Sequence, residues 1–312
     1  MILCAGECLI DMLPADGAFV PKAGGAVYNT ALALGRLGCP TAYLWPISRD
    51  HFGQDLLLPP LERANVDTSI CPRTKRPTTL AFVELSNGQA TYRFYDEGSA
   101  GRLFSTDDLP AALNADLLFI GGISLVPDPC GATLETLVDL AVQAGIPVML
   151  DPNIRPFFIQ DSAAYEARLL RLLRKATIVK LSEYEVEWLR RLPGFDLNPV
   201  AAILKSANLV VVTKGETGAE AYWAEHTHRI AGEKIAVVDT IGAGDSFNAG
   251  VIAALHRGGV LPARLQSLNS QTVQDALSLG NAVAAVTVSR EGADPPWAKE
   301  LDQASLSGPF SA

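Results

Sequence analysis

The chain has 312 residues, of which 48% are hydrophobic and 19% charged, with a net charge of −9 and a pI near 5.0. This length allows one large or two smaller domains with ample core, and the composition excludes a disordered chain. The acidic balance, without any basic stripe, argues against a general nucleic-acid binder.

The N-terminal segment favours a cytoplasmic protein. Residues 1–7 contain no basic stretch and end at Glu7, so we expect no signal peptide. No apolar run approaches the roughly 18 residues of a membrane span, so no membrane partner is expected. The five cysteines are an odd number and fit reduced thiols better than disulfides. Cys4 and Cys8 lack a second Cys or His pair that would complete a metal site, so small buried side chains are expected.

The first elements lead to a pair of glycines. Residues 2–10 predict one buried strand that ends at Asp11. The apolar spacing of residues 31, 34 and 37 predicts a helix over residues 29–37, closed by Gly38. Gly24 and Gly25 therefore stand at a helix entrance, where a ligand can approach the backbone. The alternative is a simple turn with Asn29 as a capping residue.

The next region departs from an alternating pattern. Residues 41–47 predict a strand, and residues 52–64 a helix that Pro59-Pro60 breaks. Two β-rich runs, 79–85 and 90–95, then flank Asn87-Gly88, the strongest short hairpin signal. Together with residues 12–22, this hairpin is expected to form a small sheet that projects from the main domain. The alternative is an antiparallel edge of the main sheet.

From residue 115 onward strands and helices alternate regularly. Strands are expected at 117–120, 147–150, 177–181 and 209–213, and helices at 132–144, 163–176 and 273–289. This order implies a parallel sheet with helices on both faces, whose sites lie beyond the carboxyl ends of the strands. Asp151, Asn153 and Arg155 follow one such strand. The Arg155 guanidinium suits phosphate or sugar hydroxyls, and a surface salt bridge is the alternative.

Two further strands end in polar or glycine-containing segments. Residues 180–185 contain Glu183 and Glu185, for which a plain acidic helix start is the alternative. Gly215 and Gly218 follow the strand at 209–213, and this spacing allows backbone to approach a nucleotide. His226 and His228 are interpreted as exposed hairpin side chains rather than metal ligands.

Residues 237–250 are the stretch with the clearest chemistry. Val237-Val238 is expected to end a strand, and the helical spacing begins at Gly244. Gly242 and Gly244 leave backbone N–H groups at the positive end of a helix dipole, which receives a phosphate or a developing anion. An acid there repels a resting phosphate, so Asp245 is a candidate base for a hydroxyl that attacks it. A simple helix cap is the alternative.

Two of these segments also resemble known signatures. D-T-x-G-A-G-D at 239–245 and G-G-x-x-x-N-x-A at 24–31 resemble the second and first signatures of the PfkB, or ribokinase-like, carbohydrate kinases. The resemblance covers residues 1–296 and implies an α/β fold: a ribokinase-like three-layer sandwich with a mostly parallel central sheet and a small projecting β-sheet lid. The core would comprise residues 1–11, 23–76 and 97–312, and the lid residues 12–22 and 77–96. Such a lid keeps water from taking the phosphate.

The resemblance also implies roles for individual residues. Asp245 would be the catalytic base, and the anion hole would comprise Gly242, Ala243 and Gly244. The sugar would contact Asp11, Gly24, Gly25, Asn29, Phe94 and Arg155. ATP would lie near Lys180, Thr213, Gly215, Gly218 and Asn281. Glu185 would hold magnesium through water, although Ser182 stands where the family has Asn. A monovalent cation would lie near Asp239, Ile241, Thr287, Arg290 and Gly292.

Within the family, segments 6–11, 94–100 and 151–155 are most similar to bacterial fructokinases. This similarity implies transfer of the γ-phosphate of ATP to the 6-hydroxyl of D-fructose, with Mg²⁺ and with K⁺ as activator. 2-Keto-3-deoxygluconate kinases share much of the pattern, and ribokinases or nucleoside kinases share less. A non-catalytic sugar-binding regulator is an alternative of another class, and the intact Asp245 and anion hole argue against it. We expect a homodimer through the lid, because two apolar hairpin faces are poorly covered in one subunit.

Overall fold

The computed structural model describes residues 1–86 and 89–301. In it, the main body is built on an eight-stranded sheet of order β14-β13-β12-β11-β10-β9-β1-β4. Its strands are β1 (Ile2–Ala5), β4 (Thr41–Leu44), β9 (Leu117–Gly121), β10 (Val148–Asp151), β11 (Ile178–Ser182), β12 (Leu209–Thr213), β13 (Ala219–Trp223) and β14 (His226–Ile230). The six strands from β12 to β4 pair in parallel, and β13 and β14 pair antiparallel. The parallel strands are buried on both faces, as expected for runs of Ile, Val and Leu.

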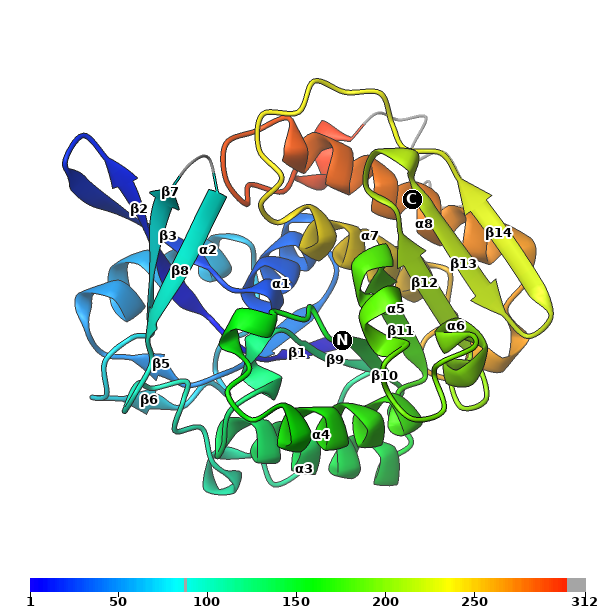
Figure 1. Cartoon of the computed structure of the whole chain (residues 1–312), viewed down its shortest axis with the longest axis horizontal. Coiled ribbons are helices and arrows are strands. Elements are labelled where there is room, and N and C mark those ends of the chain that lie inside the picture. Colours follow the sequence, from blue (N-terminus) through cyan, green and yellow to red (C-terminus); the bar gives the residue numbers. More distant parts are fainter. Residues whose placement is uncertain (87–88, 302–312) are drawn as a thin grey trace.

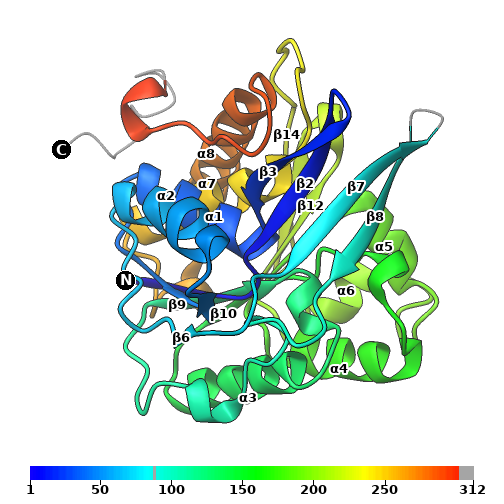
Figure 2. The ribbon, with the colours of Figure 1, turned by 90° about the vertical axis from the view of Figure 1, so that its left-hand side faces the viewer.

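Helices cover both faces of this sheet and complete three layers (Figures 1 and 2). One face carries α1 (Ala26–Arg36), α7 (Ala243–Arg257) and α8 (Ser270–Val288), with α2 (Leu58–Arg63) beside α1. The other carries α3 (Cys130–Gln143), α4 (Ser162–Lys175), α5 (Glu183–Leu189) and α6 (Pro199–Ile203). Shorter elements are β5 (Ile47–Ser48), β6 (Arg73–Thr74) and helical turns at Phe52–Leu57, Thr106–Asp108, Ile123–Leu125, Pro156–Phe158, Gly215–Thr217, Leu265–Ser267 and Ala298–Glu300. None of the helices described is long and apolar enough to cross a membrane.

A separate four-stranded sheet of order β3-β2-β7-β8 projects from this body (Figures 1 and 2). Its strands are β2 (Leu9–Ala15), β3 (Ala18–Gly24), β7 (Leu80–Ser86) and β8 (Gln89–Tyr95). β2 and β3 turn at Asp16-Gly17, where both residues have positive φ. The predicted turn at Asn87-Gly88 lies outside the described residues. The small projecting sheet is confirmed, and the alternative of a main-sheet edge is wrong.

The first predicted strand is in fact two strands in different sheets. Residues 2–10 divide into β1 and the start of β2. Gly6 separates them with φ 152°, and a Cβ at that position would lie 2.5 Å from Val27 Cγ2. The close approach of α1 therefore requires glycine here, and the chain leaves the main sheet just before Asp11.

Two other local predictions were wrong. Pro59-Pro60 does not break the helix over residues 52–63, because the segment changes from a wide π-helical turn to α2 at Leu58. The prolines thus fall in the first turn of α2, where a missing N–H costs little. Val237 and Val238 form no strand and are 61% and 64% exposed. Instead, the backbone N–H groups of Val238 and Asp239 donate to the Val288 carbonyl at the end of α8.

Candidate active site

A cavity of about 650 Å³ lies where the carboxyl ends of β10, β11 and β12 face the small sheet. It brings together segments that are far apart in the sequence. Of the predicted site residues, those that line it are Asp11, Gly25, Asn29, Phe94, Arg155, Lys180, Glu185, Thr213, Gly215, Ile241, Gly242, Ala243, Gly244 and Asp245. This position matches the prediction that the site lies beyond the strand ends.

The remaining predicted residues do not line the cavity. They are Gly24, Gly218, Asn281, Asp239, Thr287, Arg290 and Gly292. Gly24 leaves room for the acid beside it, because a Cβ there would lie 2.3 Å from Asp11 Oδ2. Gly218 has φ 105°, and a Cβ would lie 2.0 Å from the Ile230 carbonyl oxygen. Asn281 Nδ2 donates to the Ala231 carbonyl at 2.8 Å and so holds the segment after β14 against α8.

Asp245 is a buried acid in the first turn of α7. Gly242 is the N-cap residue in the left-handed region, with φ 75° and ψ 1°, and no side chain caps this helix. The Asp245 carboxylate accepts a hydrogen bond from Asn29 Nδ2 at 2.8 Å. Burial raises the Asp245 pKa to about 7, against the lowering effect of the Asn29 hydrogen bond. A carboxylate bonded to another helix, and not to its own, argues against the simple cap.

Asn29 lies in the body of α1, whose N-cap is Gly25, so the capping interpretation of Asn29 is wrong. Its amide instead reaches across to α7. The neighbouring Thr30 hydroxyl donates to the Asp245 carbonyl at 3.2 Å. The motif at residues 24–31 therefore positions Asp245 of the motif at 239–245, and this fixes the carboxylate that faces the cavity.

Asp239 holds the loop that leads into α7. Its Oδ1 accepts from the Ile241 N–H at 3.0 Å, and its Oδ2 accepts from the Gly292 N–H at 2.9 Å. A Cβ on Gly242 would lie 2.7 Å from Ala293 Cβ, so only glycine fits this backbone. The loop is therefore braced before the helix begins. Gly242, Ala243 and Gly244 line the cavity at the end of α7 where the helix dipole is positive, and the Ala243 N–H also donates to the Thr240 carbonyl at 3.3 Å.

A buried ion pair lies beside this helix start. Lys180 Nζ donates to Asp151 Oδ2 at 3.1 Å, and Asn248 Nδ2 donates to the same oxygen at 2.7 Å. Burial lowers the Lys180 pKa, but the charges of Asp151 and Glu185 outweigh it and raise the pKa overall. A Cβ on Gly244 would lie 3.2 Å from Lys180 Nζ. The ammonium group thus stands next to the backbone that would receive an anion.

Glu185 and Ser182 form a capping box at the start of α5. Glu185 Oε2 accepts from the Ser182 N–H at 2.7 Å and from the Ser182 hydroxyl at 2.8 Å. Glu185 Oε1 accepts from the Ile154 N–H at 2.9 Å. Burial raises the Glu185 pKa. Ser182 therefore has a structural role as the helix cap.

Glu7 was not predicted as a site residue. It is buried, lines the cavity, and accepts from the Ala26 N–H at 3.1 Å and the Ser124 N–H at 3.2 Å. Burial raises its pKa. The available signal was an acid inside residues 2–10, a stretch predicted to be a buried strand. Within residues 1–86 and 89–301, no three His, Cys, Asp or Glu side chains gather as a metal site, and all five cysteines are free and buried.

A three-layer α/β body, with a buried acid in the first turn of a helix under a small sheet, has the parts of a phosphotransferase site. The family model described as pfkB family carbohydrate kinase matches residues 1–300, and the chain belongs to this family. This confirms the family and the fold class predicted from the sequence.

Individual relatives cover nearly the same length. A fructokinase of Rhizobium leguminosarum bv. trifolii is 46% identical over 282 residues, which cover 88% of this chain and 86% of that protein. Fructokinase-1 of Oryza sativa subsp. japonica is 30% identical over 98% of this chain and 97% of its own length. The structure of a fructokinase with bound ATP from Xylella fastidiosa is 30% identical, with a TM-score of 0.87 over 94% of this chain and 93% of that one.

Proposed function

We propose that this carbohydrate kinase is a fructokinase that transfers the γ-phosphate of ATP to the 6-hydroxyl of D-fructose. The observation that carries the proposal is the buried Asp245 beside the start of α7, in one cavity with Asp11 and Asn29. The relatives named fructokinase, at 46% and 30% identity over most of the chain, support fructose as the sugar.

The chemistry assigns separate tasks to the two ends of the cavity. The 6-hydroxyl oxygen attacks the γ-phosphorus, the bond from the γ-phosphorus to the bridging oxygen of ADP breaks, and the hydroxyl proton passes to Asp245. The N–H groups of Gly242, Ala243 and Gly244 stabilise the charge that develops on the phosphoryl oxygens. Lys180 adds a positive charge beside them.

The sugar end combines acids and hydrogen-bond donors. Burial raises the Asp11 pKa to about 6, and this acid lies next to Gly24, which leaves it room. In the proposal Asp11, Asn29 and the backbone at Gly25 bind the hydroxyl groups. Phe94 covers the sugar from the small sheet, and the exposed Arg155 binds at the rim. Residues 12–22 and 77–96 would form the lid, and the rest of the chain the core.

The nucleotide end would use Thr213 and Gly215, which line the cavity. Gly218 and Asn281 do not line it, and they would act through the segment after β14, which both contact. Mg²⁺, when bound, would neutralise phosphate charge. Glu185 fits a role through water, because its carboxylate lines the cavity but already accepts protein hydrogen bonds. A cytoplasmic location agrees with ATP as donor and with five buried free thiols.

Fructose specificity is tested with a panel of sugars at fixed ATP and magnesium. D-Fructose should give a higher kcat/KM than ribose, 2-keto-3-deoxygluconate or inosine. Formation of ADP and of sugar phosphate are measured together, so that hydrolysis of ATP is not counted as transfer. A higher kcat/KM for a competitor would assign another sugar to the same kinase, and sugar binding without turnover would favour the regulator.

The pH profile should report the proposed base. Asp245 acts only when unprotonated, and burial places its pKa at about 7 in the ligand-free protein. We therefore expect kcat/KM to rise with pH below about 7 and to level off above it, because kcat/KM reports groups of the free enzyme. Rates at saturating coupling enzyme, measured from the acidic to the alkaline side of this pKa, would test this. A flat profile across the pKa contradicts the assignment.

Potassium is proposed to activate the enzyme. The Asp239 carboxylate accepts from the Ile241 and Gly292 N–H groups. Thr287 is buried, and a Cβ on Gly242 of this loop would lie 3.9 Å from Thr287 Cγ2. With Arg290, these residues would place carbonyl oxygens around a monovalent cation that steadies the anion hole. Replacing potassium by sodium should lower kcat. Equal rates in potassium, sodium and a bulky organic cation would remove this proposal.

The outer face of the small sheet is proposed to pair with a second subunit. Phe19 and Tyr95 are 45% and 57% exposed, and both rings contact Phe82 edge-on. Such an apolar surface favours a partner, and a second copy of the lid would bury it. Light scattering at micromolar concentration should give about twice 33.2 kDa, and Phe19→Asp should reduce it toward 33.2 kDa. A wild-type mass of 33.2 kDa contradicts the dimer.

A further inference from the structure

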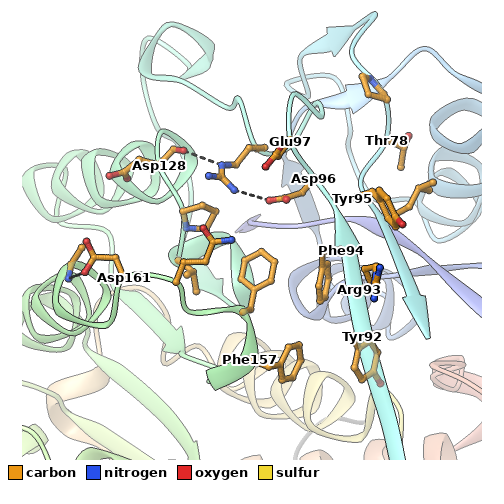
Figure 3. Close-up of a pocket in the computed structure, with 18 of the residues that line it drawn as sticks. Thr78, Tyr92, Arg93, Phe94, Tyr95, Asp96, Glu97, Asp128, Phe157 and Asp161 are labelled. Atoms are coloured by element: carbon orange, nitrogen blue, oxygen red, sulfur yellow. Dashed lines mark hydrogen bonds and ion pairs between the residues drawn. The ribbon is translucent and has the colours of Figure 1, made fainter. Parts of the chain in front are cut away.

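Four aromatic side chains join the small sheet to the main body. Tyr92 and Phe94 come from β8, and Phe157 and Phe158 from the helical turn after β10. Tyr92 and Phe157 stack with centroids 5.6 Å apart and planes at 9°. Phe94 stacks on Phe157 at 6.3 Å and meets Phe158 edge-on at 4.8 Å. Figure 3 shows Tyr92, Phe94 and Phe157 side by side between these two segments.

These rings also separate two cavities. A second cavity, of about 810 Å³, lies between β8, the loop that follows it and the starts of α3 and α4 (Figure 3). Tyr92, Phe94 and Phe157 line both this cavity and the one that contains Asp245. The aromatic stack is therefore the shared wall, and parting the rings would join the reaction cavity to the second one.

β8 is fastened at one end by other contacts. It lies at the edge of its sheet and pairs with β7. Beyond its last residue, Arg102 Nη1 donates to Asp96 Oδ2 at 2.8 Å and Arg102 Nε donates to the Asp128 carbonyl at 3.0 Å, both dashed in Figure 3. The stack holds the part of β8 that covers the cavity, whereas Arg102 holds the part next to the core.

Phe157, which stacks on the rings of β8, belongs to a segment that also faces the sugar end of the reaction cavity. Phe157 follows Arg155 by two residues, and both line the reaction cavity. Burial is the largest cause of the raised pKa of the Tyr92 hydroxyl; the negative charge of Asp11 raises this pKa further, and the positive charge of Arg155 lowers it. Because Arg155 and Phe157 belong to one short segment that lines the reaction cavity, a sugar that orders Arg155 would steady Phe157, and with it the lid strand.

We propose that Phe157 is a positioning residue that latches β8 over the reaction cavity and keeps it closed toward the second cavity. The inference deepens the proposed kinase function and rests on it for its kinetic consequence. Loss of one aromatic pair should change the equilibrium between the closed and open positions of β8 by roughly 3- to 10-fold. Without the latch, the sugar should bind less tightly and water should reach the phosphate more often.

The first test needs no substrate. Amide hydrogen exchange of the segment Gln89–Tyr95 is compared in wild-type protein, Phe157→Ala and Phe157→Tyr. We expect exchange to be about 3- to 10-fold faster in Phe157→Ala and near wild type in Phe157→Tyr, which keeps the ring. Leu197→Ala, a truncation at a side chain 87% exposed, is the control and should leave this segment unchanged. Equal exchange in wild type and Phe157→Ala overturns the latch.

The second test is kinetic. Phe157→Ala should raise the KM for fructose by a similar factor while changing kcat less, and it should form more than one ADP per sugar phosphate. Phe157→Tyr should have the wild-type KM for fructose and the wild-type ratio of ADP to sugar phosphate. The latch would also be overturned if Phe157→Ala had an unchanged KM for fructose and formed one ADP per sugar phosphate. If wild-type protein phosphorylates no sugar, the proposed function fails, and the exchange comparison alone decides for or against the latch.

Discussion

Asp245→Asn is expected to lower kcat by about 10² to 10⁴, the usual contribution of a general base. Asparagine keeps the size of the side chain and an oxygen that can accept the Asn29 hydrogen bond of 2.8 Å, but it cannot take the proton. The proposed anion hole at Gly242 to Gly244 is backbone and should continue to act, so activity should be reduced and not abolished. The Kd for sugar should change much less than kcat.

The matched control is the same substitution at Asp161, whose carboxylate caps α4 by accepting from the Ala164 N–H. Asn and Asp rank alike as caps, so Asp161→Asn should retain activity and stability. We would measure kcat, the Kd for sugar and the thermal midpoint on each variant. A near wild-type kcat for Asp245→Asn, with an unchanged midpoint, would show that another group is the base.

The parts of the site that could be predicted are those that one short segment determines. At position 242 the backbone has φ 75° and lies close to Ala293, so it requires glycine. Such requirements appear in the sequence as glycines at fixed spacing. The pair Gly24-Gly25 is similar: a Cβ on Gly25 would lie 2.4 Å from the Glu7 carbonyl oxygen. The small sheet was predictable because strand alternation and turn residues are local signals.

The parts that could not be predicted depend on contacts between distant segments. Asn29 and Asp245 are 216 residues apart, and nothing local shows that one orients the other. Val237 and Val238 have high β-propensity, yet they pair with no strand among the described residues and stay exposed. Glu185 was assigned to magnesium by resemblance, whereas its hydrogen bonds to Ser182 and Ile154 became visible only in the fold.

Lys180→Met is expected to have the largest effect on stability. Lys180 and Asp151 form an ion pair at 3.1 Å, and the two residues are 4% and 2% exposed. Removing the ammonium group would leave the Asp151 charge buried with two neutral donors, Asn248 Nδ2 and the Asn153 N–H, and breaking such a pair costs about 3–5 kcal/mol of the free energy of unfolding. The loss should appear as a thermal midpoint lower by several degrees. Lys205→Met, at an exposed lysine, should change the midpoint little.

The double variant Lys180→Met with Asp151→Asn separates the structural role of the lysine from its catalytic one. The introduced asparagine would carry no charge and its oxygen could still accept from Asn248, so much of the lost stability should return. Activity should stay low, because the positive charge beside Gly244 is still missing. Urea unfolding and kcat are measured on both variants at the same pH. A Lys180→Met protein as stable as wild type would show that the pair adds nothing to the fold, and recovery of kcat in the double variant would show that Lys180 serves only to neutralise Asp151.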